Sequence, residues 1–215
     1  VFTDAAGTFQ GQFSCRSCHP DGHTDSLIWD FVIDGVGSNL VETRSLRGIR
    51  HTAPFKWNGK NPDLATQCGP RFAMVLTRTD PFSPEDLGDL VTYIESIPRA
   101  PIRQPDALAA ARERGRELFF RDATTAGEEI PVVNRCPTCH RPPLFTDRLM
   151  SDVGTGGAFD TPHLFDIASS PPYLHDGRYT TIRQLLVEGR HGPDHLPPDA
   201  LDAQEIDDLV AFVLS

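Results

Sequence analysis

Two short clusters of cysteine and histidine are the residues best equipped for chemistry in this 215-residue chain. Each cluster reads Cys-x-x-Cys-His, formed by Cys15, Cys18 and His19 and again by Cys136, Cys139 and His140. This is the attachment signature of c-type haem, in which two thiols one helical turn apart bond to the porphyrin and the adjacent histidine binds the iron. The sequence therefore predicts two covalently attached haem c groups, with His19 and His140 as proximal ligands.

Other cysteine chemistry fits the two motifs less well. Compact zinc sites place such pairs about 15–20 residues apart, whereas these pairs lie in opposite halves of the chain. A thioredoxin-type site would need a βαβ pattern, which is not seen, and five cysteines in 215 residues do not make a disulfide-dense scaffold. The fifth, Cys68, is expected to be a small buried apolar residue.

Charge and hydropathy restrict the partners. A formal net charge of -10 argues against nucleic acid and anionic membrane surfaces and favours a redox protein partner with a basic patch. No apolar run is long enough for a membrane span. Haem attachment of this kind normally takes place outside the bacterial cytoplasm, so a periplasmic or other extracytoplasmic location is expected. The chain opens without a signal peptide, and we expect a mature form or a fragment.

The chain contains an internal repeat, which indicates how it is organised. Residues 43–59 align without gaps on residues 161–177, sharing Thr, Leu, Ile, Pro, an aromatic residue and a closing Gly. Helical patterns follow at 89–94 and 208–213, each after capping and acidic residues at 83–86 and 202–205. A further helix is expected over 109–120, before the second haem motif. Only the equivalent of the last residues of that helix precedes the first motif. The first unit is therefore expected to begin in the middle of a helix.

These observations predict a mainly α fold made of two tandem cytochrome c-like haem domains, with long loops and little sheet. The first domain is expected over 1–97 and the second over 106–215. A proline-rich linker over 98–105 is expected to be extended and stiff.

The C-terminal motifs resemble those of the bacterial dihaem cytochrome c peroxidase/MauG superfamily. They include the sequences Phe-Thr-Asp from Phe145, Val-Gly-Thr-Gly from Val153, Phe-Asp-Thr-Pro-His-Leu from Phe159 and Pro-Tyr-Leu-His-Asp-Gly from Pro172. In the first unit, Trp57-Asn-Gly-Lys is similar to the family's Trp-Asp-Gly-Arg. The opening Cys-His-Pro-Asp-Gly-His is more similar to dihaem domains fused to larger extracytoplasmic proteins.

The resemblance implies further roles. It makes Trp57 a relay for electrons between the haems, although an aromatic wedge between the domains is an equal alternative. The family often has a glutamine ten residues after this tryptophan, as Gln67 is here. Gln67 or Arg71 would polarise peroxide but would not replace a proton shuttle. The resemblance also implies a calcium ion between the haems, at the positions of Glu42, Ser170 and Pro172, where Glu42 replaces the family's Asn.

The sixth ligand of each iron decides between an electron carrier and a peroxide-reactive haem. For the first haem the candidate is Met74, with His51 and His23 as rivals and core packing as the alternative role. For the second it is His191, which follows Gly177 at nearly the spacing by which Met74 follows Gly59. Met150, His175 and His195 are the alternatives there, and His163 is expected to be a loop residue.

Two functions follow as hypotheses. The first is a dihaem c-type cytochrome that transfers electrons between periplasmic redox partners, alone or within a larger polypeptide or complex. The second is a dihaem peroxidase or MauG-like oxidase that reduces hydrogen peroxide at one haem. Peroxide chemistry requires an acid–base residue over the iron, and no Asp or Glu occurs between Leu64 and Thr79. The sequence therefore favours the carrier and leaves enzymatic activity open.

Overall fold

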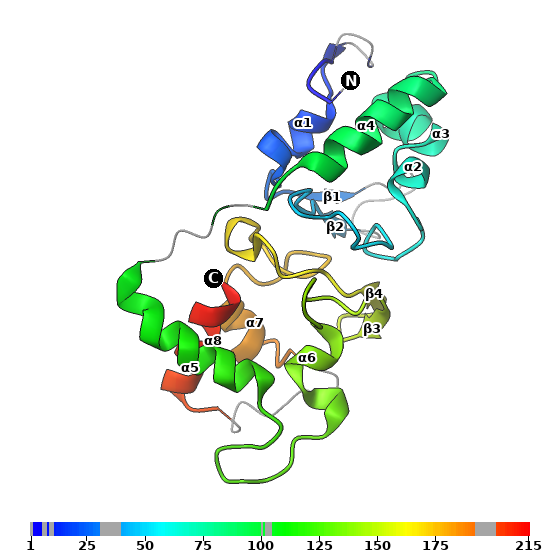
Figure 1. Ribbon diagram of the computed structural model, residues 1–215. Helices are drawn as coiled ribbons and strands as arrows, with labels where there is room; N and C mark the ends of the chain where they lie inside the picture. Colours follow the sequence, from blue (N-terminus) through cyan, green and yellow to red (C-terminus); the bar gives the residue numbers. More distant parts are fainter. Residues whose placement is uncertain are drawn as a thin grey trace.

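The computed structural model describes residues 2–5, 8, 11–30, 40–99, 101, 105–191 and 201–215. Within these ranges the chain is mainly helical with two small two-stranded sheets, which confirms the predicted fold class. Figure 1 shows two lobes, one running from α1 to α4 and the other from α5 to α8. We refer to them as the N-terminal half (2–99) and the C-terminal half (105–215). Residues 100 and 102–104 of the predicted linker, and His195, lie outside the described residues.

The N-terminal half is built from short elements joined by ordered loops. Its helices are α1 (Cys15–Cys18), α2 (Leu64–Gln67), α3 (Pro70–Phe72) and α4 (Pro84–Ser96), with a 3-10 turn η2 (Pro20–Gly22) and a π-helical turn η3 (Ala73–Thr77). Its strands are β1 (Ile28–Asp30) and β2 (Leu40–Glu42), which pair antiparallel.

The C-terminal half repeats this plan. Its helices are α5 (Ala109–Phe120), α6 (Cys136–Cys139), α7 (Ile182–Val187) and α8 (Ala203–Val213), with 3-10 turns η4 (Asp106–Leu108), η5 (Val132–Asn134) and η6 (Ile167–Ser169). Its strands are β3 (Met150–Asp152) and β4 (Ala158–Asp160), again antiparallel. Of the helices in the described ranges, none is long and apolar enough to cross a membrane.

Helices α4 and α8 begin where the capping residues predicted them. The Ser83 hydroxyl accepts a hydrogen bond from the Asp86 N–H at the start of α4, and Pro84 occupies the first turn. Asp202 and Glu205 form a capping box at the start of α8. These local signals explain why the predicted and observed starts agree.

Each half has its own apolar core. In the N-terminal half, Leu90 and Ile94 of α4 pack against Ile49, Leu64 and Phe2. Cys68 is buried in the same cluster, as expected for an apolar thiol, and burial raises its pKa to about 12. In the C-terminal half, α5 crosses α8, and Phe119 contacts Phe212 with ring centroids 5.3 Å apart.

The end of each hairpin contacts a loop of the other half, in an approximate twofold arrangement. Glu42 at the end of β2 donates its N–H to the carbonyl of His175, at 2.7 Å. Asp160 at the end of β4 donates its N–H to the carbonyl of Trp57, at 2.8 Å. Trp57 and His175 occupy equivalent positions in the sequence repeat, so each half binds the other through the same backbone contact.

A glycine in each half makes this close approach possible. A Cβ atom on Gly59 would lie 2.6 Å from the Met150 sulfur, and one on Gly177 would lie 2.3 Å from Ile28 Cδ1. Both glycines have positive φ, 59° and 64°. Only glycine satisfies both the left-handed backbone and the contact distance without strain.

Candidate haem-binding sites

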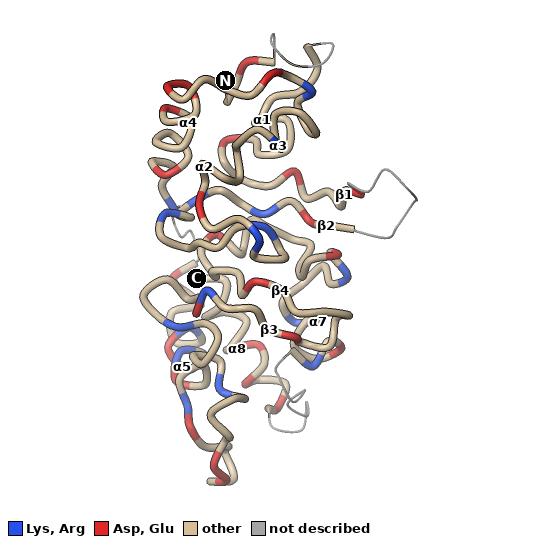
Figure 2. Tube along the Cα trace, turned by 90° about the vertical axis from the view of Figure 1, so that its right-hand side faces the viewer, with Lys and Arg blue, Asp and Glu red and all other residues tan. Residues whose placement is uncertain are grey.

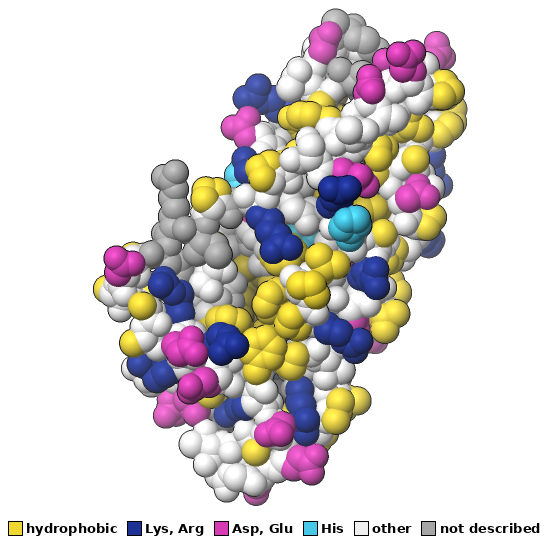
Figure 3. Space-filling view, in the orientation of Figure 1, with side chains coloured by type: hydrophobic (Ala, Val, Ile, Leu, Met, Phe, Trp, Pro, Cys, Tyr) yellow, Lys and Arg dark blue, Asp and Glu magenta, His cyan; other side chains and the backbone are white. Residues whose placement is uncertain are grey.

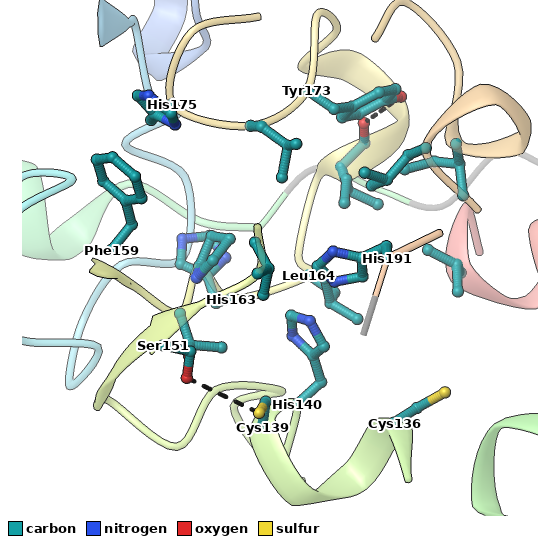
Figure 4. Close-up of a pocket in the computed structure, with 18 of the residues that line it drawn as sticks. Cys136, Cys139, His140, Ser151, Phe159, His163, Leu164, Tyr173, His175 and His191 are labelled. Carbon is teal, nitrogen blue, oxygen red and sulfur yellow. Dashed lines mark hydrogen bonds between the residues drawn. The ribbon is translucent and has the colours of Figure 1, made fainter. Parts of the chain in front are cut away.

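The second Cys-x-x-Cys-His motif lines a large, mostly apolar cavity in the C-terminal half. Cys136 and Cys139 lie at the two ends of the single-turn helix α6, and His140 ends that turn. All three face the cavity, as Figure 4 shows for the labelled residues. Burial raises the pKa of the Cys136 thiol to about 11. The motif therefore presents two neutral thiols and one imidazole to the same space.

Both proximal histidines are held in one tautomer by the backbone. His140 Nδ1 lies 3.1 Å from the carbonyl oxygen of Phe145, and His19 Nδ1 lies 3.3 Å from that of His23. A carbonyl only accepts hydrogen bonds, so Nδ1 is the donor and Nε2 keeps its lone pair. Burial lowers the pKa of both imidazoles, which favours the neutral, metal-binding form.

His191 faces His140 across the cavity, with ring centroids 6.1 Å apart (Figure 4). A first-row metal lies about 2.0–2.1 Å from the imidazole nitrogen that binds it. That nitrogen lies about 1.1 Å from the centre of its ring. Two imidazoles that bind one metal from opposite sides would therefore have ring centroids about 6.3 Å apart. Burial, and then the charge of His140, lowers the pKa of His191 to about 4. His140 and His191 are therefore the residues that would hold an iron in this cavity.

Between α7 and His191, the backbone at Gly189 is closely packed. A Cβ atom on Gly189 would lie 2.6 Å from the Leu185 carbonyl oxygen and 2.8 Å from the Tyr179 ring. Any larger residue would push the segment away from the cavity, so Gly189 allows His191 to approach. The backbone N–H of His191 donates to the Leu185 carbonyl at 3.3 Å.

The cavity wall fits a large apolar group that carries polar edges. Its lining includes Phe119, Leu164, Leu186 and Leu209. Several buried polar atoms of the wall have no hydrogen-bond partner among the described residues, namely Nδ1 of His163 and His191, Asn134 Oδ1 and Thr155 Oγ1. Buried polar atoms normally have partners, so a bound group with its own donors and acceptors, such as haem, is compatible with this wall.

The first motif has the same local structure. Cys15 and Cys18 bound helix α1, and Cys15 packs against the N-terminal core. Burial, and then the charge of Asp25, raises the pKa of Cys18 to about 11. The local geometry of α1 and His19 therefore matches that of α6 and His140.

The structure does not bring the candidate distal residues of the first haem into one buried site. Met74 lies on η3 and is 58% exposed. His51 is also exposed. The ring of His23 is directed to the C-terminal half, where its Nδ1 lies 2.8 Å from the carboxylate of Asp166.

The alternatives at the second haem lie elsewhere. The sulfur of Met150 packs against Gly59 of the N-terminal half. His175 stacks on Phe159, with ring centroids 3.7 Å apart and planes 15° apart. His163 lines the cavity, and burial lowers its pKa to about 3.

Trp57 lies at the junction of the two halves. Its indole N–H donates to the Glu42 carbonyl at 2.9 Å, and its ring centroid lies 6.5 Å from that of His175. The Arg44 guanidinium lies 5.0 Å above the ring, a cation–π contact. Trp57 therefore belongs to the part of the cavity wall that the N-terminal half supplies.

Arg44 and the buried Asp160 form an ion pair that sequence reasoning missed. The guanidinium Nη1 lies 2.8 Å from Asp160 Oδ2, and the Asp160 side chain is only 1% exposed. The pair joins the two halves beside Trp57. Asp160 belongs to the motif that follows Val153-Gly-Thr-Gly, but nothing in the sequence indicates that its partner is Arg44.

The remaining predicted residues have clear positions. Glu42, Ser170 and Pro172 line the same cavity, and the Glu42 carboxylate accepts a hydrogen bond from Thr24 at 3.2 Å. Burial raises the pKa of Glu42 to about 8. Gln67 accepts a hydrogen bond from the Asn61 amide, in the loop after Trp57. Within the described ranges, no three His, Cys, Asp or Glu side chains converge as a metal site.

Known proteins resemble this chain over almost its whole length, although no family model matches it. Hydrazine synthase subunit gamma from Kuenenia stuttgartiensis is 31% identical over 99% of this chain and 74% of its own length. The solved structure of hydrazine synthase from that organism superposes with a TM-score of 0.82 at 29% identity, covering 99% of this chain and 84% of the other.

Two further proteins resemble the chain at lower identity, one in sequence and one in structure. Methylamine utilization protein MauG from Methylorubrum extorquens is 23% identical over 99% of this chain and 75% of its own length. The dihaem peroxidase BthA from Burkholderia thailandensis has a TM-score of 0.60 at 19% identity, over 99% of this chain and 83% of the other.

Proposed function

Because the chain belongs to the MauG/dihaem cytochrome c peroxidase superfamily, a group of dihaem proteins, we propose that it is a c-type cytochrome that transfers electrons between redox partners. Two haems would be attached at Cys15 and Cys18 and at Cys136 and Cys139. The placement of His191 opposite His140 carries the proposal, with centroids 6.1 Å apart. An iron with two strong axial ligands carries electrons and has no open position for peroxide.

The chain's own residues would bind and orient the two groups. When bound, each haem supplies one-electron iron chemistry. His19 and His140 would present Nε2 to the irons because backbone carbonyls hold their Nδ1 atoms. The apolar wall of the cavity would keep water from the second haem, and Phe119 and Leu209 belong to that wall.

We propose that Trp57 relays electrons between the two haems. Its support is its position at the junction, edge-on to His175, which in turn stacks on Phe159. The Arg44 guanidinium above the ring disfavours a long-lived positive charge on the indole. A relay that passes electrons without storing charge suits a carrier better than an oxidase.

A dihaem peroxidase is the second candidate, and one observation favours it. Met74 is exposed, so the sixth position of the first haem is not supplied by a buried side chain at this residue. Peroxide would then react at the first haem, with Gln67 to polarise it. The missing acidic residue between Leu64 and Thr79 weighs against this candidate.

Partners and location follow from charge and from the relatives. We propose that the protein acts outside the cytoplasm as part of a larger assembly, because one relative is a subunit of hydrazine synthase. Acidic residues occur in both halves, and several Lys and Arg residues lie near the junction (Figure 2). Hydrophobic side chains gather in the middle of one face, with Lys and Arg around them (Figure 3). A redox protein could approach the haems at this face.

We also propose a calcium ion bound by the carboxylate of Glu42 and by oxygens of Ser170 and Pro172. All three residues line one cavity, and hard cations prefer oxygen ligands. Calcium is expected to raise the melting temperature of the holoprotein, and Glu42→Gln is expected to abolish most of that rise. The measurement is a thermal melt with and without calcium. An equal rise in both proteins would reject Glu42 as a ligand.

Optical spectra of the purified holoprotein test the proposed function. Mass spectrometry should find two haems per chain, and added hydrogen peroxide should leave the spectrum unchanged. A near-infrared band from methionine-bound iron that disappears in Met74→Ala would identify Met74 as a ligand of the first haem despite its exposure. Stopped-flow reduction should show a slower inter-haem phase in Trp57→Phe. A wild-type haem that reacts with peroxide would favour the peroxidase instead.

A further inference from the structure

A carboxylate from the C-terminal half is buried in the loop that follows the first haem motif. The Asp166 side chain is 1% exposed, and its Oδ2 lies 2.8 Å from His23 Nδ1. The same oxygen accepts a hydrogen bond from the Ser45 hydroxyl at 3.0 Å. Both partners of Oδ2 belong to the N-terminal half, so Asp166 joins the two halves at this loop.

Asp166 Oδ2 and His23 Nδ1 are in direct contact, but the contact does not have the geometry of a hydrogen bond. Asp166 also adopts a left-handed backbone conformation, with φ of 60°, which Asp tolerates better than most residues. The backbone places this side chain against the loop of the other half despite that cost.

The same loop holds the proximal histidine of the first haem. The carbonyl oxygen of His23 lies 3.3 Å from His19 Nδ1. His23 therefore connects Asp166 with His19, because its side chain contacts Asp166 and its backbone carbonyl contacts His19. Gly22, just before it, has a φ of 81° and packs closely on Ile97, so the loop has little freedom to move independently.

We propose that Asp166 is a positioning residue for the first haem, acting from the C-terminal half through His23 on His19. This rests on the proposed function, in which His19 binds iron. The partner of a ligating imidazole sets its orientation and its basicity. Asp166 holds His23 in place, so that its carbonyl stays on His19 Nδ1. A stronger bond at Nδ1 would make the imidazole a better electron donor, and the oxidised form of a bound iron would be favoured.

At the second haem motif, the described residues place a different contact. The carbonyl that contacts His140 belongs to Phe145, whose ring centroid lies 6.2 Å from that of Phe165. An aromatic contact stands there in place of the contact between a carboxylate and an imidazole. The proposal therefore predicts an effect on one haem only.

Redox titration of the holoprotein tests this through two single variants, Asp166→Asn and His23→Gln. Both are expected to raise the reduction potential of the first haem and leave that of the second unchanged. Asn tolerates the left-handed backbone of position 166, so the fold should be kept. The double variant should shift the potential no further than the larger single shift, because both changes break one contact. Asp207→Asn, which removes the same charge from an exposed ion pair with Arg183, should shift neither potential.

The outcomes separate the proposal from simpler explanations. Loss of a nearby negative charge alone would raise the potential in Asp166→Asn but not in His23→Gln, and that result would overturn the positioning role. Unchanged potentials in both variants, with two haems attached, would overturn it as well and leave the proposed function standing. A wild-type protein without attached haem would instead overturn the proposed function. If Asp166→Asn does not fold, His23→Gln alone decides, with electron paramagnetic resonance of the first haem as the second readout.

Discussion

Gly115→Ala is expected to disrupt the crossing of α5 and α8 and to destabilise the protein by about 3 kcal/mol or more, at or above the upper end for overpacking. A Cβ atom at this position would lie 1.9 Å from the carbonyl oxygen of Asp208 and 2.9 Å from Phe212 Cβ. The carbonyl belongs to the backbone of α8, so it cannot rotate away as a side chain would. The helices must separate, and the contact between Phe119 and Phe212 would loosen with them. Chemical denaturation of the holoprotein measures the loss.

Gly88→Ala is the matched control. Gly88 also lies within a helix, α4, but a Cβ atom there would meet nothing within 4 Å. Without a clash, alanine is expected to stabilise the helix by about 0.5–1 kcal/mol relative to glycine. Opposite signs for the two variants would show that close packing, and not helix propensity, requires Gly115. Equal effects would contradict this account of the crossing.

Local sequence signals predicted the elements of the fold well. The helix expected over 109–120 is α5, Ala109–Phe120, and α4 and α8 begin at the expected caps. These features depend on neighbouring residues, namely capping side chains and helical spacing of apolar residues. The repeat also indicated that the two halves share a plan, since residues 43–59 and 161–177 align.

The sequence did not predict which residues of the two halves contact each other. Asp166 contacts His23, and Arg44 pairs with Asp160, although each pair is far apart along the chain. Such pairs depend on how two folded units dock, and no local pattern encodes the docking. Trp57 and His175 were recognised as repeat positions, but their edge-on contact follows only from the approximate twofold arrangement.

The two candidate distal ligands lie in different surroundings, and both assignments stay predictions. Met74 and His191 were both predicted from their distance along the chain after Gly59 and Gly177, the last residues of the aligned segments. His191 lies buried and opposite His140, because Gly189 lets the chain pass close over Tyr179. Met74 lies exposed on the π-helical turn η3, which has no counterpart after α7 in the described residues. Spacing predicts a position along the chain, whereas the local backbone decides where the side chain points.

His191→Gly is expected to convert one of the two haems from a low-spin to a high-spin state. His191 is the imidazole that faces His140 at a spacing suited to one iron, and glycine removes that ligand without adding bulk to the cavity. An iron with an open position is accessible to small molecules. We therefore expect the variant to respond to hydrogen peroxide, and added imidazole to restore the low-spin spectrum. Optical and electron paramagnetic resonance spectra measure both changes.

His163→Gly is the matched control for this prediction, because His163 is another buried histidine of the same cavity with an unpartnered Nδ1. Its replacement should leave both haems low-spin if His191 alone supplies the sixth ligand. A high-spin haem in His163→Gly, with an unchanged spectrum in His191→Gly, would transfer the ligand role to His163. A high-spin haem that imidazole cannot restore would point to a disturbed cavity and would count against a simple loss of ligand.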